Sequence, residues 1–196
     1  MKQFVRYYLA VYNLSSFIFW SLFLLQFLFS SFELTDIGIV LLNIAQGMAL
    51  LEVVHTILKW VKSPIISTAA QVFSRIFVLV LINLFRHHEP LLALTHIGFI
   101  IVAIAWSITE IVRYSYYFLL LFNREPRWLL WMRYSFFIIL YPLGVTGEWL
   151  IFGTPIFEQG ITLNLYTLVI GITLIAYIYY FPVLYGYMWR QRKAKV

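Results

Sequence analysis

The amino-acid sequence predicts an all-α integral membrane protein, a bundle of six membrane-spanning helices with both termini in the cytoplasm. Of its 196 residues 63% are hydrophobic, the mean hydropathy is +0.88 and only 11% are charged. In ordinary globular proteins about a quarter of the residues are charged. Apolar windows of about 20 residues, the length that crosses a bilayer, recur along the chain. We therefore expect a single membrane domain that covers residues 1–196.

Six apolar windows reach the required length. The first follows a short basic start, and its apolar run is too long for the core of a signal peptide, so we expect it to be retained. The fourth is long enough that it must tilt or extend into water. The expected spans are approximately residues 9–29, 37–58, 66–85, 91–122, 128–152 and 163–189.

Basic residues are concentrated at alternate ends of these windows. Lys2 and Arg6 precede the first span, Lys59 and Lys62 follow the second, and Arg124 and Arg127 follow the fourth. The residues after the sixth span are Arg190, Arg192, Lys193 and Lys195. The loop after the first span holds Glu33 and Asp36 without Lys or Arg. Loops rich in Lys and Arg stay in the cytoplasm. The charge pattern and the even number of spans therefore agree on two cytoplasmic termini.

Composition also excludes several classes of function. The net charge of +6 is explained by the membrane-flanking basic residues, so we do not expect nucleic-acid binding. The sequence has no cysteine, which rules out disulfides, thiolate metal ligands and cysteine nucleophiles. It contains neither an HExxH zinc motif nor repeated histidine boxes, and no dinucleotide-binding fingerprint. We expect neither a metal nor a cofactor.

Ionisable and strongly polar side chains fall inside the expected spans, where a charge costs at least a few kcal/mol. Spacing places them in groups on single helix faces: Glu52 with His55, Gln71 with Arg75, and Glu110 with Arg113, Tyr114 and Tyr117, while Arg133 opens the fifth span. Such residues should face the bundle interior and pair, so we interpret Glu52–His55 and Glu110–Arg113 as structural pairs. A role of this whole set in binding substrate or supporting the catalytic residues stays open. For Arg75 a partnership with Glu52 or Glu148 and a contact with an anionic substrate both stay open.

The fifth span contains Tyr141 and Glu148, seven residues apart and thus about two helical turns apart on nearly one face. Pro142, Gly144 and Gly147 are expected to loosen the helix and let its backbone line a cavity. A buried carboxylate facing a phenol suits acid–base chemistry on a lipid-like substrate. The alternative is a structural carboxylate that accepts a hydrogen bond from a neighbouring helix.

The chain resembles the very-long-chain (3R)-3-hydroxyacyl-CoA dehydratases, also called protein-tyrosine-phosphatase-like A proteins. The matching stretches are Tyr8-Leu9-Ala10-Val11-Tyr12-Asn13, Leu51-Glu52-Val53-Val54-His55, Ser63-Pro64, Thr68, Gln71-Val72-Phe73-Ser74-Arg75, Trp106-Ser107-Ile108-Thr109-Glu110-Ile111-Val112-Arg113-Tyr114, Tyr116-Tyr117, Arg133-Tyr134, Leu140-Tyr141-Pro142-Leu143-Gly144 and Gly147-Glu148. The resemblance covers nearly the whole chain in order.

The resemblance implies that Tyr141 and Glu148 are the catalytic pair. It also implies dehydration of 3-hydroxyacyl-CoA to trans-2-enoyl-CoA in the fatty-acid elongation cycle of the endoplasmic reticulum membrane, with the elongase and reductases of that cycle as partners. Phosphatase activity through a thiolate is excluded, because the chain has no cysteine. The basic residues on the expected cytoplasmic side that should attract the polyanionic coenzyme A are Lys59, Lys62, Arg124 and Arg127.

For the mechanism, we expect Glu148 to act as base toward the C2 proton and Tyr141 to donate a proton to the departing hydroxyl. The reverse assignment, and a single Glu148 with Tyr141 only orienting substrate, stay open. Tyr141 lies roughly 20 Å and Glu148 roughly 30 Å along the fifth helix. Either a deep cytoplasmic cavity or a helix break near Pro142 must admit the substrate. A non-catalytic scaffold of the elongation complex and a small ion or solute transporter are the alternative functions.

Overall fold

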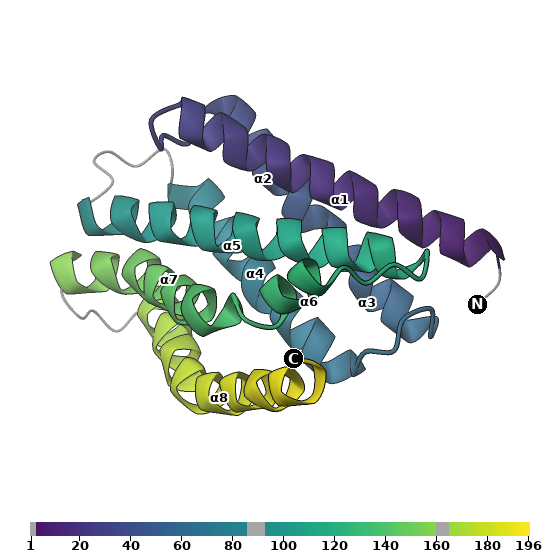
Figure 1. Ribbon diagram of the computed structural model, residues 1–196. Helices are drawn as coiled ribbons and strands as arrows, with labels where there is room; N and C mark the ends of the chain where they lie inside the picture. Colours follow the sequence, from purple (N-terminus) through teal and green to yellow (C-terminus); the bar gives the residue numbers. More distant parts are fainter. Residues whose placement is uncertain (1–2, 86–92, 160–164) are drawn as a thin grey trace. The chain divides into compact units, whose positions relative to one another are not determined.

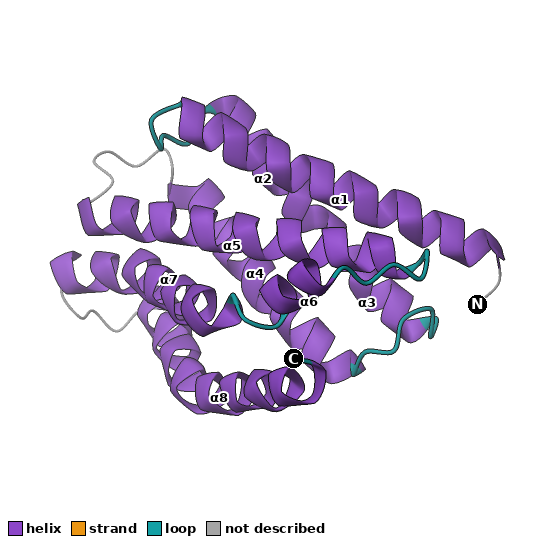
Figure 2. Ribbon diagram, viewed as in Figure 1, coloured by secondary structure: helices purple, strands orange, loops and turns teal. Residues whose placement is uncertain are grey.

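The computed structural model describes residues 3–85, 93–159 and 165–196. In these ranges helices joined by loops are the only regular secondary structure (Figures 1 and 2). The all-α prediction is confirmed for this part of the chain. The first residues of the expected fourth and sixth spans, 91–92 and 163–164, lie outside it. The helices are α1 (Gln3–Phe29), α2 (Asp36–Met48), α3 (Leu50–Ile57), α4 (Ile65–Phe85), α5 (Ala93–Leu120), α6 (Arg127–Arg133), α7 (Phe137–Gln159) and α8 (Leu165–Lys195).

Among the described residues, five helical segments are long and apolar enough to cross a membrane. They are Gln3–Phe29, Asp36–Ile57, Thr95–Leu120, Arg127–Gly153 and Thr167–Lys195. Each coincides with an expected span, and a helix suits this environment because it satisfies every backbone polar group internally. The expected third span lies on α4, whose apolar stretch Gln71–Asn83 is shorter. The protein is a multi-pass membrane protein.

The corner between α1 and α2 is fixed by side-chain hydrogen bonds. The Thr35 hydroxyl caps α2 by accepting a hydrogen bond from the Gly38 N–H at 3.1 Å. The Gln26 amide of α1 donates to the same hydroxyl at 2.6 Å. One threonine therefore satisfies a free N–H at the start of α2 and ties this start to the end of α1.

The expected fifth span is interrupted before Pro142, not at it. α6 ends at Arg133 and α7 begins at Phe137, so the non-helical residues are 134–136 (Figure 2). From there α7 continues without a break through Pro142, Gly144 and Gly147. The prediction that these residues loosen the helix, and the suggested break near Pro142, were wrong. Pro142 sits in the second turn of α7, where it removes only one hydrogen bond of the helix.

The described residues fall into two compact units. One comprises residues within 1–89 and 113–124, and the other residues within 90–112 and 125–196. In the first unit α1 packs along α2, and α4 packs against α2 and α3. In the second unit α7 packs against α8. The first part of α5 belongs to the second unit and its end to the first.

Candidate functional site

In the second unit, the carboxylate of Glu148 is buried on α7 and hydrogen-bonded at both oxygens. Only 7% of the residue is exposed. The Trp106 indole N–H of α5 donates to Oε1 at 3.2 Å, and the Tyr177 hydroxyl of α8 donates to Oε2. An ionised carboxylate is tolerated in an apolar interior only when such donors replace water. Two donors from two different helices thus hold the carboxylate that the sequence singled out.

The glycines beside Glu148 allow α5 and α7 to approach closely. A Cβ placed on Gly147 would lie 2.7 Å from the Gly98 carbonyl oxygen and 2.8 Å from Val102 Cγ2. A Cβ on Gly98 would likewise lie 2.7 Å from the Gly147 carbonyl oxygen. Small residues at such crossings are typical of membrane helix pairs. The crossing brings Trp106 within reach of Glu148, so Gly147 serves packing rather than helix loosening.

Tyr141 lies two turns before Glu148 in α7 and is half-buried. Its ring stacks on Phe181 at a centroid distance of 5.1 Å and on Tyr185 at 6.2 Å, both from α8. Seven residues of α-helix correspond to about 10 Å along the axis. α8 therefore contacts both residues of the expected catalytic pair.

The same part of α8 compensates for Pro142. Proline has no N–H, so the carbonyl of Ile138, four residues earlier, loses its partner within the helix. The Tyr185 hydroxyl donates to this carbonyl at 3.2 Å. A buried carbonyl without a partner costs free energy comparable to a lost hydrogen bond, and Tyr185 supplies that bond from the neighbouring helix.

The first unit contains a second polar cluster, centred on Glu52 of α3. Arg113 Nη1 and Nη2 bind its two oxygens at 3.0 and 2.5 Å. The Tyr114 hydroxyl donates to Oε1 at 2.6 Å, and the Tyr12 hydroxyl does so at 3.4 Å. The side chains of Glu52 and Arg113 are each 17% exposed. This bidentate geometry is the strongest form of the arginine–carboxylate pair.

His55 joins this cluster through aromatic contacts. Its Nε2 lies 3.1 Å from the Tyr8 hydroxyl, and its ring stacks on Trp60 and meets Tyr12 edge-on at 4.7 Å. Sequence spacing grouped Glu52 with His55 on one helix face and gave no indication of Tyr8, Tyr12 or Trp60 as partners. The Glu52–Arg113 pair joins residues 61 apart in the chain, and helical spacing cannot predict such a pair.

The other residues that the sequence singled out are distributed over several elements. Glu110 is fully buried on α5, and Arg75 is half-buried and Gln71 exposed on α4. Tyr117 is half-buried beside Tyr116, at a centroid distance of 5.9 Å. The remaining residues are Arg133, half-buried at the end of α6, and the exposed Lys59, Lys62, Arg124 and Arg127.

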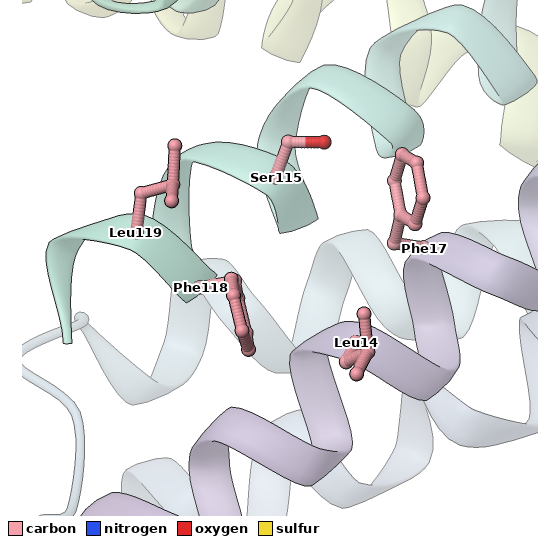
Figure 3. Close-up of a pocket in the computed structure, with 5 residues that line it drawn as sticks. All are labelled: Leu14, Phe17, Ser115, Phe118 and Leu119. Atoms are coloured by element: carbon pink, nitrogen blue, oxygen red, sulfur yellow. The ribbon is translucent and has the colours of Figure 1, made fainter. Parts of the chain in front are cut away.

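An apolar pocket of about 210 Å³ opens in the first unit between α1 and the end of α5. Figure 3 shows its lining residues, which are Leu14, Phe17, Ser115, Phe118 and Leu119. Its volume lies below the roughly 300–1,000 Å³ typical of small-molecule sites. Among the described residues, no group of three or more His, Asp or Glu is placed to hold a metal ion.

The fold and the site define a multi-pass helical membrane protein with a buried carboxylate held by an indole and a phenol. Residues 46–196 match the family model for "Protein tyrosine phosphatase-like protein, PTPLA", and the chain belongs to this family. The predicted resemblance is thereby confirmed. No solved structure matches the chain.

Curated relatives carry the name very-long-chain (3R)-3-hydroxyacyl-CoA dehydratase. The Caenorhabditis elegans relative hpo-8 is 36% identical, over 96% of this chain and 94% of its own length. Dehydratase 1 of Canis lupus familiaris is 36% identical, over 78% of this chain and 65% of its own length. PASTICCINO 2B of Oryza sativa is 36% identical over 73% of this chain and 66% of its own length. The match to the dog protein thus spans slightly less than two thirds of that relative. These relatives are, by name, hydro-lyases.

Proposed function

We propose that this protein is a hydro-lyase that removes water from (3R)-3-hydroxyacyl-CoA and releases trans-2-enoyl-CoA, in the fatty-acid elongation cycle of the endoplasmic reticulum membrane. The observation that carries this proposal is the buried Glu148, hydrogen-bonded at both oxygens and two turns after Tyr141 in α7. The family and the names of its curated relatives indicate the reaction.

Dehydration needs a base for a proton on C2 and an acid for the hydroxyl on C3. The thioester carbonyl makes the C2 proton acidic enough for a carboxylate. Glu148 removes this proton, and the C–H electron pair forms the C2–C3 double bond. As this double bond forms, the C3–O bond breaks with its electron pair on oxygen, and the Tyr141 hydroxyl donates the proton that completes water. Proton return from Glu148 to the Tyr141 phenolate restores the enzyme.

In this proposal, exposed basic residues attract the negatively charged substrate to the protein. Coenzyme A is a polyanion, and the exposed basic residues Lys59, Lys62, Arg124 and Arg127 flank the ends of helices that the charge pattern places at the cytoplasm. We propose the elongase and the reductases of the same cycle as protein partners, since the reductases supply the 3-hydroxyacyl-CoA and consume the enoyl-CoA.

We also propose that α4 makes a sixth crossing, so that both termini are cytoplasmic in one six-span domain. The absence of native cysteine makes single-cysteine labelling a direct test. The variants are Phe4→Cys, Ala194→Cys and Glu33→Cys, all at exposed positions. In sealed microsomes a membrane-impermeant maleimide should label the first two at once and the third only after permeabilisation. Labelling of only one of the two terminal cysteines would contradict six spans.

The activity test compares purified wild type with Tyr141→Phe and Glu148→Gln in detergent, with 3-hydroxypalmitoyl-CoA as substrate. Wild type should form the enoyl-CoA. Each variant should lose about 10²- to 10⁴-fold in kcat, the usual contribution of a positioned acid or base. Tyr179→Phe is the matched control, because Tyr179 of α8 is 70% exposed.

Equal losses in kcat and in substrate affinity for Tyr141→Phe would contradict its role as proton donor. If folded wild type stays inactive with other chain lengths and in a lipid bilayer, the dehydratase proposal fails. A scaffold of the elongation complex or a transporter would then be the better explanation.

A further inference from the structure

Four aromatic side chains of α8 that contact α7 lie in one stripe. The stripe consists of Tyr177, Phe181, Tyr185 and Trp189, spaced by four residues and therefore on one face of the helix. Several residues between them are exposed, for example Ile178 and Tyr179, which are 64% and 70% exposed. The stripe therefore lies on the face of α8 that packs against α7.

Each member of the stripe meets a particular position on α7. The Trp189 ring meets the Phe137 ring edge-on, at a centroid distance of 5.7 Å. Tyr185 reaches the backbone carbonyl that Pro142 leaves open, and Phe181 stacks on Tyr141. Tyr177 binds Glu148. The two helices therefore run antiparallel, and the stripe follows α7 from its start to the buried carboxylate.

Tyr177 differs from the other stripe residues because only its hydroxyl reaches the reactive group. A carboxylate held at one oxygen by Trp106 can still rotate about the bond to its carbon chain. A second donor at the other oxygen, from a different helix, fixes the plane of the carboxylate. Fixed orientation matters because a base displaced by about 1 Å can cost about 10²-fold in rate.

We propose that Tyr177 is the positioning residue for Glu148. Its hydroxyl, together with the Trp106 indole, holds the carboxylate in the orientation from which it removes the substrate proton. This assignment rests on the proposed dehydratase function and deepens it, because it adds a residue of the last helix to a pair that lies on α7. Neither spacing nor composition singles Tyr177 out among the tyrosines of α8.

The decisive variant is Tyr177→Phe, which removes the hydroxyl and keeps the ring. A hydrogen bond to a charged group contributes enough free energy for kcat to fall about 10- to 100-fold when it is lost. KM should stay within about twofold, because Tyr177 acts on the base and not on substrate. Tyr180→Phe is the matched control and should leave both constants unchanged, because Tyr180 of the same helix is 57% exposed.

A double-mutant cycle, measured by thermal unfolding, reports on the contact between Tyr177 and Glu148 without requiring enzyme activity. Tyr177→Phe should lower the Tm of the wild-type protein and have a much smaller effect in a Glu148→Gln background, where the charged acceptor is gone. A fall in Tm of equal size in both backgrounds, with kcat and KM impaired together, would show a merely structural tyrosine and overturn the assignment.

The outcomes separate this inference from the function on which it rests. Active wild type, inactive Glu148→Gln and fully active Tyr177→Phe would overturn only the role of Tyr177. Inactive wild type would overturn the dehydratase function and this assignment with it. Active wild type with a selective loss of kcat in Tyr177→Phe would support both.

Discussion

Replacing Gly147 by alanine tests the close crossing of α5 and α7. The new Cβ would lie 2.7 Å from the Gly98 carbonyl oxygen, whereas ordinary contacts begin at 3.4 Å. The obstacle is helix backbone, which has no rotamer with which to move aside. The two helices must therefore separate by about 0.7 Å, the difference between these distances. Overpacking of this kind costs about 1–3 kcal/mol.

The same separation should weaken the hydrogen bond next to it. Trp106 Nε1 and Glu148 Oε1 are 3.2 Å apart, at the upper limit for N–H···O bonds. Adding the shift of about 0.7 Å gives about 3.9 Å, which is no longer a hydrogen bond. Gly147→Ala should therefore lower both the stability of the protein and its dehydratase activity.

Thermal unfolding of purified protein in detergent measures the effect. At about 2–4 °C per kcal/mol for a chain of this size, the Tm should fall by about 2–12 °C. Gly186→Ala in α8 is the matched control, because nothing lies within 4 Å of its added Cβ. There alanine is simply the better helix former, and the Tm should hold or rise. An unchanged Tm in Gly147→Ala would refute the packing argument.

Two further predictions concern hydrogen bonds between helices. Tyr185→Phe should cost about 1 kcal/mol of unfolding free energy by leaving the Ile138 carbonyl without its donor. In a Pro142→Ala background, where residue 142 regains its N–H, the same change should cost almost nothing; equal costs in both backgrounds would contradict the explanation. Arg113→Lys should cost about 1.5–3 kcal/mol in thermal unfolding, because a lysine cannot bind both oxygens of Glu52. An Arg113→Lys protein as stable as wild type would show that the bidentate geometry contributes nothing.

The helical class and most of the membrane segments could be predicted from sequence because they depend on local hydropathy. Glu148 could be singled out for the same reason, since a charge in an apolar stretch is conspicuous, and Tyr141 because it stands seven residues before Glu148 with a proline and two glycines between them. The side chains that hydrogen-bond Glu148 could not be predicted from the sequence. Trp106 and Tyr177 are aromatic residues among many, and only the packing of three helices gives them a common target. The role of Gly147 was misread because a glycine that breaks a helix and one that admits a neighbour look alike in sequence.

The bond from Tyr185 to the Ile138 carbonyl makes two distant positions of the chain depend on each other. The hydroxyl at 185 is needed for this bond only while proline occupies 142, and the proline in turn relies on that hydroxyl to satisfy the open carbonyl. Loss of the hydroxyl while proline is present leaves the carbonyl without its donor, whereas loss of the proline first restores a partner within the helix. Over evolutionary time the two positions should therefore change together, with replacement of the proline coming first and freeing residue 185 to vary.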